Sequence, residues 1–313
     1  MRARIALAML AVLALTAAGC GAGGDESSIV GKDTLVIGVK PDQPGLGVKK
    51  REGVYEGFDV DVAKAIAARV AKGATVRFVD APSAKRESLL ESRQVDFIVA
   101  SYSITPERKT KVAFAGPYYV AHQDILVRRD ETGIRNVRDL RGRSLCKVAG
   151  STSWRRVQEE RGVPVRLVDG ESYSDCIAKL RNGQVDAVST DDLILAGFAA
   201  EQGNAFKIVN ARFTDERYGI GIHKSDIEGC EAINKAITAL YQDGTIPKLL
   251  KKWFDGTGLE LTDTVPQFEG CDCPARAAAA PPRARGRPVC VCAARPRRRS
   301  PPRARHGGRV RGR

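Results

Sequence analysis

Short, mostly apolar runs alternate along the chain with segments in which apolar residues recur every three or four positions. Residues 34–39 (TLVIGV) form a run of strand length, whereas residues 58–70 carry a bulky apolar residue at every fourth position, with charges opposite. The first pattern predicts a buried strand and the second an amphipathic helix. The expected strands cover residues 34–39, 76–79, 95–100, 124–127, 144–148, 165–168, 185–189 and 218–222, and the expected helices 58–70, 83–92, 154–161, 173–181, 227–242 and 246–254, with further helices opening at Thr105 and Thr190. Strand alternating with helix predicts an α/β fold with a mainly parallel sheet.

The alternation falls into two series, which predicts two lobes. The sequence Gly116-Pro117-Tyr118-Tyr119 interrupts the first series, and a second begins at the strand 124–127. We expect two α/β lobes joined by extended crossings near residues 120–125 and 214–218. The expected lobe 1 comprises residues 34–122 and 217–262, and the expected lobe 2 comprises residues 123–216. Ligands of such sheets bind beyond the carboxyl ends of the strands.

The first residues have the pattern of an export signal. Arg2 and Arg4 precede an apolar run over residues 5–15, which is shorter than the roughly 20 residues of a membrane-spanning helix. Small residues before Gly19-Cys20 resemble a bacterial lipobox, so residues 1–19 are expected to be removed and Cys20 to be lipidated. Residues 20–33 would then be a flexible tether, and the protein would lie on the outer face of the cytoplasmic membrane. The alternative is a cleaved soluble signal with an incidental cysteine.

The net charge of +14 comes from the end of the chain. Residues 275–313 contain thirteen arginines and no acidic residue, and the remainder has 38 basic and 37 acidic residues. The expected folded part is therefore nearly neutral, which argues against a nucleic-acid-binding surface. We expect residues 263–313 to be a disordered Arg/Pro/Ala-rich tail. The tail is either a basic arm for anionic lipid or wall polymer or, as we favour, a product of read-through or a changed reading frame, and we assign it no function.

A candidate anion site follows the strand 95–100. Ser101 and Ser103 leave that strand, and Thr105 has the form of a helix N-cap with proline next to it. Arg108 then falls in the first helical turn, where a cation works against the helix dipole. A guanidinium, two hydroxyls and free helix-terminal N–H groups would together hold a carboxylate. The alternative is a solvated surface arginine.

Two further candidates lie in the second series. Gly150, Ser151 and Thr152 form a strand-to-helix turn that offers N–H and hydroxyl groups to an anion. Asp191 follows a strand end and can accept hydrogen bonds from an ammonium group. Their alternatives are an ordinary capped turn and a helix N-cap.

The chain has eight cysteines, which in an exported protein indicate disulfides. Cys146 and Cys176 flank one expected lobe and are the preferred pair. Cys230, Cys271 and Cys273 stay ambiguous, with Cys230–Cys271 as one possible pair.

Several motifs occur in an order that resembles the family 3 (polar amino-acid) solute-binding proteins of ABC importers. These motifs are Gly57-Phe58-Asp59-Val60-Asp61-Val62-Ala63, Tyr102-Ser103-Ile104-Thr105-Pro106-Glu107-Arg108-Lys109, Phe114-Ala115-Gly116-Pro117-Tyr118-Tyr119 and Tyr218-Gly219-Ile220-Gly221. The loop Gln43-Pro44-Gly45-Leu46-Gly47, the cysteines 146 and 176 and the sequence Asp191-Asp192-Leu193-Ile194-Leu195-Ala196-Gly197 look like the actinobacterial glutamate-binding lipoproteins. The resemblance covers about residues 30–260 and implies the two-lobed type II fold of periplasmic binding proteins.

The resemblance also implies roles for particular residues. Arg108 would bind the α-carboxylate of an amino acid, with help from Ser103, Ser151 and Thr152. Asp191 and the backbone of Ser101 would bind the α-ammonium group. Thr190 and the loop from Lys40 to Gln43 would face the ligand side chain.

The function implied is that of a non-enzymatic, monomeric binding protein that delivers glutamate to an ABC permease and its ATPase subunit. Alternatives are another polar amino acid, such as aspartate or glutamine, or a dehydratase-type enzyme on the same fold. The three histidines lie off the expected binding loops, and the expected folded part has no phosphate loop or metal-spaced His/Cys cluster, so we expect no cofactor or metal.

A glutamate side chain needs a cation besides Arg108, because a buried, unpaired carboxylate costs several kcal/mol. Lys40 and Arg86 are the candidates, and Lys40 is favoured because its loop leaves the first strand directly toward the cleft. The alternative is that both are solvated side chains at the rim.

Overall fold

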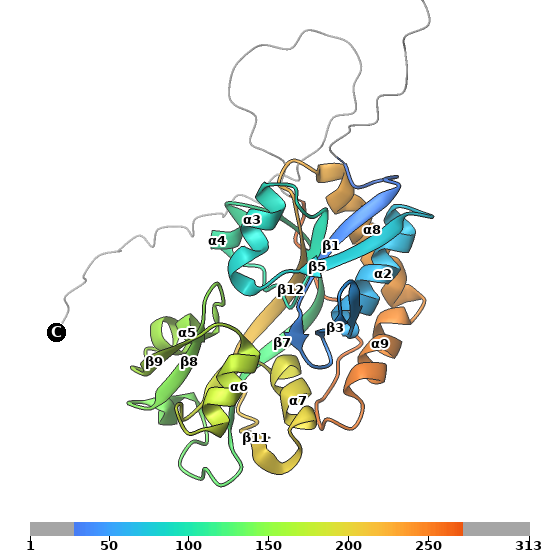
Figure 1. Cartoon of the computed structure of the whole chain (residues 1–313). Coiled ribbons are helices and arrows are strands. Elements are labelled where there is room, and N and C mark those ends of the chain that lie inside the picture. Colours follow the sequence, from blue (N-terminus) through green and yellow to red (C-terminus); the bar gives the residue numbers. More distant parts are fainter. Residues whose placement is uncertain (1–27, 272–313) are drawn as a thin grey trace, which may run out of the picture. The chain divides into compact units, whose positions relative to one another are not determined.

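Two long antiparallel strands, β7 (Ala113–Arg128) and β12 (Thr214–Ile222), run through the centre of the computed structural model, which describes residues 28–271 (Figure 1). They pair from Ala113–Ile222 to Gln123–Thr214, with a register shift between Tyr218 and Ile220. The strand expected at 124–127 is therefore the second half of β7. The apolar pattern does not show this continuity, because Gly-Pro usually ends a strand, whereas here a bulge absorbs the irregularity.

Lobe 1 is built on parallel strands beside this pair. Strand β1 (Thr34–Val39) pairs in parallel with β5 (Thr75–Asp80) and β6 (Phe97–Val99), and β6 is antiparallel to β12. Helices α2 (Phe58–Val70), α8 (Ile227–Gln242) and α9 (Thr245–Phe254) cover one face of the sheet, and the short helices η1 (Ser83–Lys85), α3 (Arg86–Glu91) and α4 (Pro106–Lys109) lie on the other (Figure 1). A small antiparallel sheet follows β1, formed by β2 (Asp42–Gln43), β3 (Gly47–Arg51) and β4 (Val54–Glu56).

Lobe 2 uses the second half of β7. Strands β10 (Val188–Asp191) and β11 (Phe206–Ile208) pair with it antiparallel, while β8 (Ser144–Val148) and β9 (Arg166–Gly170) form a separate parallel pair. The helical segments of this lobe are η2 (Val137–Leu140), α5 (Ser153–Arg155), the π-helical η3 (Arg156–Glu160), α6 (Tyr173–Arg181), α7 (Asp192–Glu201) and η4 (Gly203–Ala205). The parallel pairs that the alternation predicts are present, and the crossing strands add antiparallel pairs, so the main sheet is mixed.

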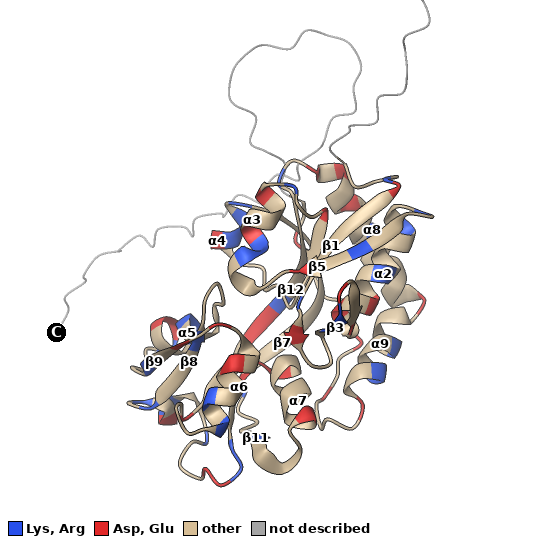
Figure 2. Cartoon of the chain, viewed as in Figure 1, with Lys and Arg blue, Asp and Glu red and all other residues tan. Residues whose placement is uncertain are grey.

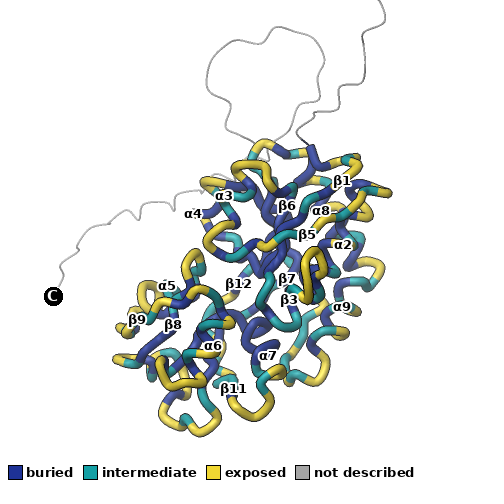
Figure 3. The backbone as a smooth tube through the Cα atoms, viewed as in Figure 1, coloured by how far each residue is buried: buried dark blue, intermediate teal, exposed yellow. Residues whose placement is uncertain are grey.

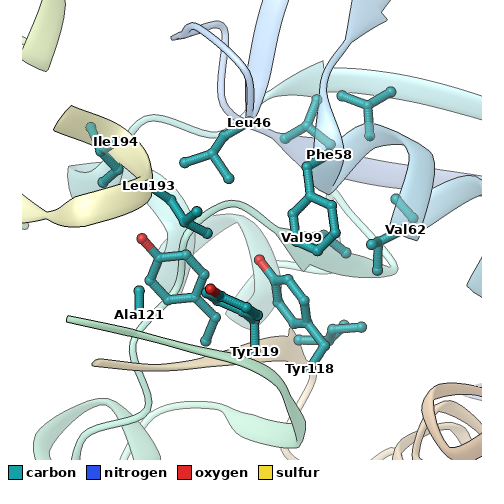
Figure 4. Close-up of a cluster of buried hydrophobic side chains, with 14 of the residues drawn as sticks. Leu46, Phe58, Val62, Val99, Tyr118, Tyr119, Ala121, Leu193 and Ile194 are labelled. Carbon is teal, nitrogen blue, oxygen red and sulfur yellow. The ribbon is translucent and has the colours of Figure 1, made fainter. Parts of the chain in front are cut away.

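The core continues across the two crossing strands. Phe58 from α2, Tyr118 and Tyr119 from β7 and Leu193 from α7 belong to one cluster of buried side chains (Figure 4). Burial is concentrated along these central elements, and exposed residues lie mainly in the outer loops and helix faces (Figure 3). Acidic and basic residues are interspersed over the elements (Figure 2), in keeping with a nearly neutral folded part.

Two disulfides are present. Cys146 in β8 is bonded to Cys176 in α6, which confirms the preferred pair. Cys230 in α8 is bonded to Cys271, the pair that the sequence left open.

Both expected boundaries of the folded part differ from the structure. Ile29 is buried, and its N–H donates to Asp226 Oδ2 over 2.9 Å, so residues 28–33 are not simply a tether. Beyond residue 262, the main-chain N–H of Glu269 donates to the oxygen of Gly116 and the disulfide holds Cys271. Residues 1–27, which include the expected leader and Cys20, and residues 272–313, which include Cys273 and the arginine-rich segment, lie outside the described residues. Within 28–271, no helix is both long and apolar enough to cross a membrane.

Candidate binding cleft

Arg108 lies at the carboxyl end of β6, where the sequence places it. Thr105 caps α4 as expected: its Oγ1 accepts a hydrogen bond from the N–H of Arg108 over 3.2 Å. The Arg108 side chain is only 6% exposed, donating to the main-chain oxygens of Ser103 over 2.7 Å and Gly150 over 3.0 Å. Burial, and next the charge of Arg86, lowers the pKa of Arg108 to about 10. Arg108 is therefore a buried cation and not the solvated surface arginine of the alternative.

Arg86 brings a second guanidinium to the same place. It is 2% exposed, and its Nη1 donates to Ala100 O over 3.0 Å. Its guanidinium carbon lies 4.1 Å from the centre of the Tyr102 ring, and that of Arg108 lies 5.0 Å from it. The Nε of Arg86 has no hydrogen-bond partner among residues 28–271. Two guanidinium groups therefore lie over one ring, and one of them has an unused donor, which is the chemistry that an anion would need.

Lys40 is the third buried cation. It is 3% exposed, and its Nζ donates to Ser83 Oγ over 2.6 Å. Burial, followed by the charge of Arg86, lowers the pKa of Lys40 to about 7. Neither Lys40 nor Arg86 is therefore a solvated side chain at the rim.

Gln43 supplies one more unused donor. Its side chain is fully buried, and its Oε1 accepts a hydrogen bond from Ser101 Oγ over 2.9 Å. The Nε2 of Gln43 has no partner in the described part of the chain. A buried amide donor of this kind is expected to meet an acceptor, since leaving it unpaired costs about 1–3 kcal/mol.

Lobe 2 contributes an acid and hydroxyl groups. Asp191 is 5% exposed, and its Oδ2 accepts the Tyr218 hydroxyl over 2.7 Å. Asp191 occupies the N-cap position of α7, but its side chain makes no capping hydrogen bond, so it can bind a ligand instead. Burial, and then the nearby Glu216 carboxylate, raises the pKa of Asp191 to about 8. Thr152 likewise stands at the N-cap of α5 without capping it.

The structure brings most of the predicted site residues to one cavity. Eight of the ten line it directly, namely Arg86, Ser101, Ser103, Arg108, Ser151, Thr152, Thr190 and Asp191. Lys40 and Gln43 reach the same place through their hydrogen bonds to Ser83 and Ser101. The cavity is narrow, about 20 Å³, because the lobes are closed on each other: both Arg86 and Arg108 donate across it to Gly150 O.

Four lining residues are not among the ten predicted site residues, namely Ser83, Ser153, Tyr173 and Ile194. Ser83 ends the loop 80–83 that follows an expected strand, and Ser153 ends the strand-to-helix turn at Gly150, so the position of both serines after strand ends already placed them near the cleft. Tyr173 is the first residue of α6 and belongs to no quoted motif, whereas Ile194 lies in the motif from Asp191 to Gly197, for which the resemblance implied a ligand contact only at Asp191. Among residues 28–271 there is no group of His, Cys, Asp and Glu that could hold a metal ion.

The model of the bacterial extracellular solute-binding proteins, family 3, matches residues 35–256 of this chain. The chain belongs to this family. It is therefore related to the amino-acid-binding proteins of ABC importers, which act outside the cytoplasm, and the resemblance seen in the sequence motifs is confirmed.

The names of the curated relatives refer to several different amino acids. The chain is 41% identical over 254 residues to the glutamate-binding protein GluB of Corynebacterium glutamicum, covering 77% of this chain and 85% of that protein. It is 34% identical over 260 residues to the glutamine-binding protein GlnH of Bacillus subtilis, covering 79% and 94%. These relatives are described as binding proteins and not as enzymes.

Solved structures agree on the fold. An ancestral arginine-binding protein bound to arginine superimposes with a TM-score of 0.66 at 34% identity, covering 72% of this chain and 99% of that one. An ancestral amino-acid-binding protein described as a precursor of cyclohexadienyl dehydratase gives a TM-score of 0.64 at 31% identity, covering 71% and 95%. The two-lobed type II fold is thus established, and it is shared with the lineage of an enzyme.

Proposed function

We propose that this protein is the glutamate-binding component of an amino-acid ABC importer. The observation that carries the proposal is the presence of three buried basic side chains in lobe 1. Arg108, Arg86 and Lys40 converge there, each no more than 6% exposed. A neutral amino acid offers one carboxylate to this group, whereas glutamate offers two.

In this proposal each end of glutamate has its own partners. Arg108, Ser103, Ser151 and Thr152 receive the α-carboxylate, and Asp191 with the backbone of Ser101 receives the ammonium group. The side-chain carboxylate meets Lys40 and the unused donors of Arg86 and Gln43, while Thr190 lies beside the side chain. A cationic ligand such as arginine would place its charge against Lys40 and Arg86, which disfavours it.

The lobes would open and close about β7 and β12. Residues 34–122 with 217–262 would move against residues 123–216, and the closed form, which presents both lobes to the ligand, would be the one the permease and its ATPase partner recognise. We propose that the protein acts as a monomer. We also propose that lipidation of Cys20 holds it on the outer face of the membrane; a Cys20→Ala variant that stays membrane-bound would contradict this.

The function is tested by a calorimetric screen of the purified protein against the common amino acids. Glutamate should bind most tightly and should be recovered unchanged after incubation. Aspartate and glutamine are the competitors, since they differ from glutamate by one methylene or one charge. Chemical conversion of any bound amino acid would favour the dehydratase-type alternative.

A further inference from the structure

Two tyrosines on the crossing strands each donate to a buried carboxylate. The hydroxyl of Tyr118 in β7 donates to Asp59 Oδ1 over 2.7 Å, and that of Tyr218 in β12 donates to Asp191 Oδ2 over 2.7 Å. All four side chains are 5% exposed or less, and the two ring centres are 6.0 Å apart. Asp59 belongs to lobe 1 and Asp191 to lobe 2, so the paired tyrosines contact one acid from each side.

Both acids are linked to the binding cavity, Asp191 directly and Asp59 through Ser101. Asp59 does not line it, but its Oδ2 accepts the main-chain N–H of Ser101 over 2.8 Å. Ser101 has a φ of 43°, in the left-handed region that a residue with a side chain rarely adopts, so this hydrogen bond helps hold a strained peptide at the site. Asp191 lines the cavity itself, and in the described part of the chain its carboxylate accepts a hydrogen bond from Tyr218 only.

We propose that Tyr218 and Tyr118 are positioning residues for amino-acid binding, and that they orient Asp191 and, through Asp59, the Ser101 peptide toward the ligand ammonium group. This inference rests on the proposed function, because it takes Asp191 as the ammonium acceptor. Neither hydroxyl contacts the ligand. Each hydroxyl acts by fixing a group that contacts the ligand. Strands β7 and β12 cross between the lobes, so the strands about which the lobes close also align Asp191 and the Ser101 peptide.

The charges around Asp191 make this role measurable. Glu216 from β12 and Asp192 from α7 oppose its ionisation, Arg108 from α4 favours it, and Tyr173 from α6 lies nearby. Burial is the largest effect and raises the pKa of Asp191 to about 8, while the Tyr218 hydroxyl opposes the rise. Removing that hydroxyl should raise the pKa further, so at a given pH fewer molecules would present the carboxylate that an ammonium group needs.

The experiment is calorimetric titration of Tyr218→Phe with glutamate between about pH 6 and pH 9. A hydrogen bond to a charged group corresponds to roughly 10- to 100-fold in affinity, so the variant should bind that much more weakly near pH 6. The deficit should shrink toward pH 9, because the pH then exceeds the pKa of Asp191 in the wild type and approaches the raised pKa of Asp191 in the variant. The matched control is Tyr119→Phe, which removes the hydroxyl of the buried β7 residue that pairs with Tyr218 of β12. This control should change the affinity by less than about twofold.

The variant Asp191→Asn distinguishes the positioning role of the tyrosines from the proposed function itself. If Asp191→Asn binds glutamate as well as the wild type, the ammonium role in the proposed function is wrong. If Asp191→Asn loses binding while Tyr218→Phe matches the wild type at every pH, the positioning role is overturned and the proposed function stands. A deficit in Tyr218→Phe that is the same at every pH also overturns it, since a purely structural effect would look like that. Should Tyr218→Phe fail to fold, Tyr118→Phe carries the test, and unchanged affinity in that variant refutes the proposal.

Discussion

At the scale of single residues, the cleft combines cations and acids whose burial shifts their pKa values in opposite directions. Burial lowers the pKa of Lys40 to about 7 and raises that of Asp59 to about 6. Groups with such values are frequent at functional sites, because burial there keeps charges available for a ligand. The sequence indicated Arg108, Lys40 and Asp191 from strand ends and motifs. It did not single out Asp59, whose position in the first turn of α2 resembles an ordinary favourable charge at a helix start.

Arg108→Ala should nearly abolish glutamate binding while the protein still folds. Losing the partner of a buried charge costs about 3–5 kcal/mol, or at least a hundredfold in affinity. Calorimetry measures the affinity, and circular dichroism checks the fold. The control is Arg69→Ala in the last turn of α2, where Arg69 pairs with Asp243 over 2.6 Å and does not line the cavity. Wild-type affinity in Arg108→Ala would remove this residue from the site.

Proton exchange should distinguish glutamate from glutamine. A bound side-chain carboxylate would raise the pKa of Lys40 from about 7, so Lys40 takes up protons, whereas the ammonium group would lower the pKa of Asp191 from about 8, so Asp191 releases them. Glutamine has no side-chain carboxylate, so its binding should cause only the proton release from Asp191. Near pH 7.5, glutamate should therefore release fewer protons than glutamine, as measured by calorimetry in buffers of different ionisation enthalpy.

The difference in proton release should disappear in Lys40→Met, and the preference for glutamate should weaken as pH rises above about 7. Equal proton release with both ligands in the wild type would mean that Lys40 does not meet the side chain.

At the scale of elements, the predicted strands and helices are largely present, and the exceptions have local causes. The alternation of apolar runs gave β1, α2, β8 and α6 close to their observed limits because each has a clear period and a capped or turn-rich boundary. The sequence pattern did not predict that residues 113–128 form one strand. That continuity depends on pairing with β12, which lies far away in the sequence. The pairing of Cys230 with Cys271 also depends on tertiary structure and could not be decided from spacing.

Removing the Cys146–Cys176 disulfide should destabilise lobe 2. The bond closes a loop with a sequence separation of 30, for which the chain-entropy estimate is about 3–4 kcal/mol. Cys146→Ala/Cys176→Ala should therefore unfold at a lower temperature and lower denaturant concentration than the wild type. An unchanged transition would contradict the prediction. Cys230→Ala/Cys271→Ala serves as the comparison, since it removes the disulfide of the other lobe.

At the scale of the whole folded part, close approach of the lobes depends on small residues. A Cβ on Gly150 would lie 2.5 Å from the backbone of Ala84, and one on Gly197 would lie 1.9 Å from Pro44 O. Glu107 and Arg155 form an ion pair of 2.7 Å between the lobes, and Ser174 Oγ donates to Asp42 O over 3.0 Å. The sequence pattern predicted the two lobes. Contacts between the lobes could not be predicted, because they leave no periodic pattern in the sequence of either lobe.

Gly197→Ala should weaken ligand binding without weakening the fold. Gly197 lies inside α7, where alanine is favoured over glycine by about 1 kcal/mol, but its new Cβ would collide with Pro44 O when the lobes close. We expect lower glutamate affinity and a larger radius of gyration with saturating ligand, measured by calorimetry and small-angle scattering. Gly270→Ala is the control, because a Cβ there meets nothing within 4 Å. If Gly197→Ala closes and binds glutamate like the wild type, the prediction is wrong and the contact with Pro44 O does not limit closure.

The central claim is that buried cations of lobe 1 pair with the side-chain carboxylate of glutamate. Its most direct test is the ratio of glutamine to glutamate dissociation constants in the wild type, Lys40→Met and Arg86→Met. Lys40→Met is the cleaner variant, since among residues 28–271 the Lys40 ammonium group donates only to Ser83, whereas Arg86 also holds the main chain at Ala100. We predict that the wild type prefers glutamate and that at least one substitution narrows the preference by about tenfold or more. A wild type that prefers glutamine, or a preference that neither substitution narrows, would contradict the account.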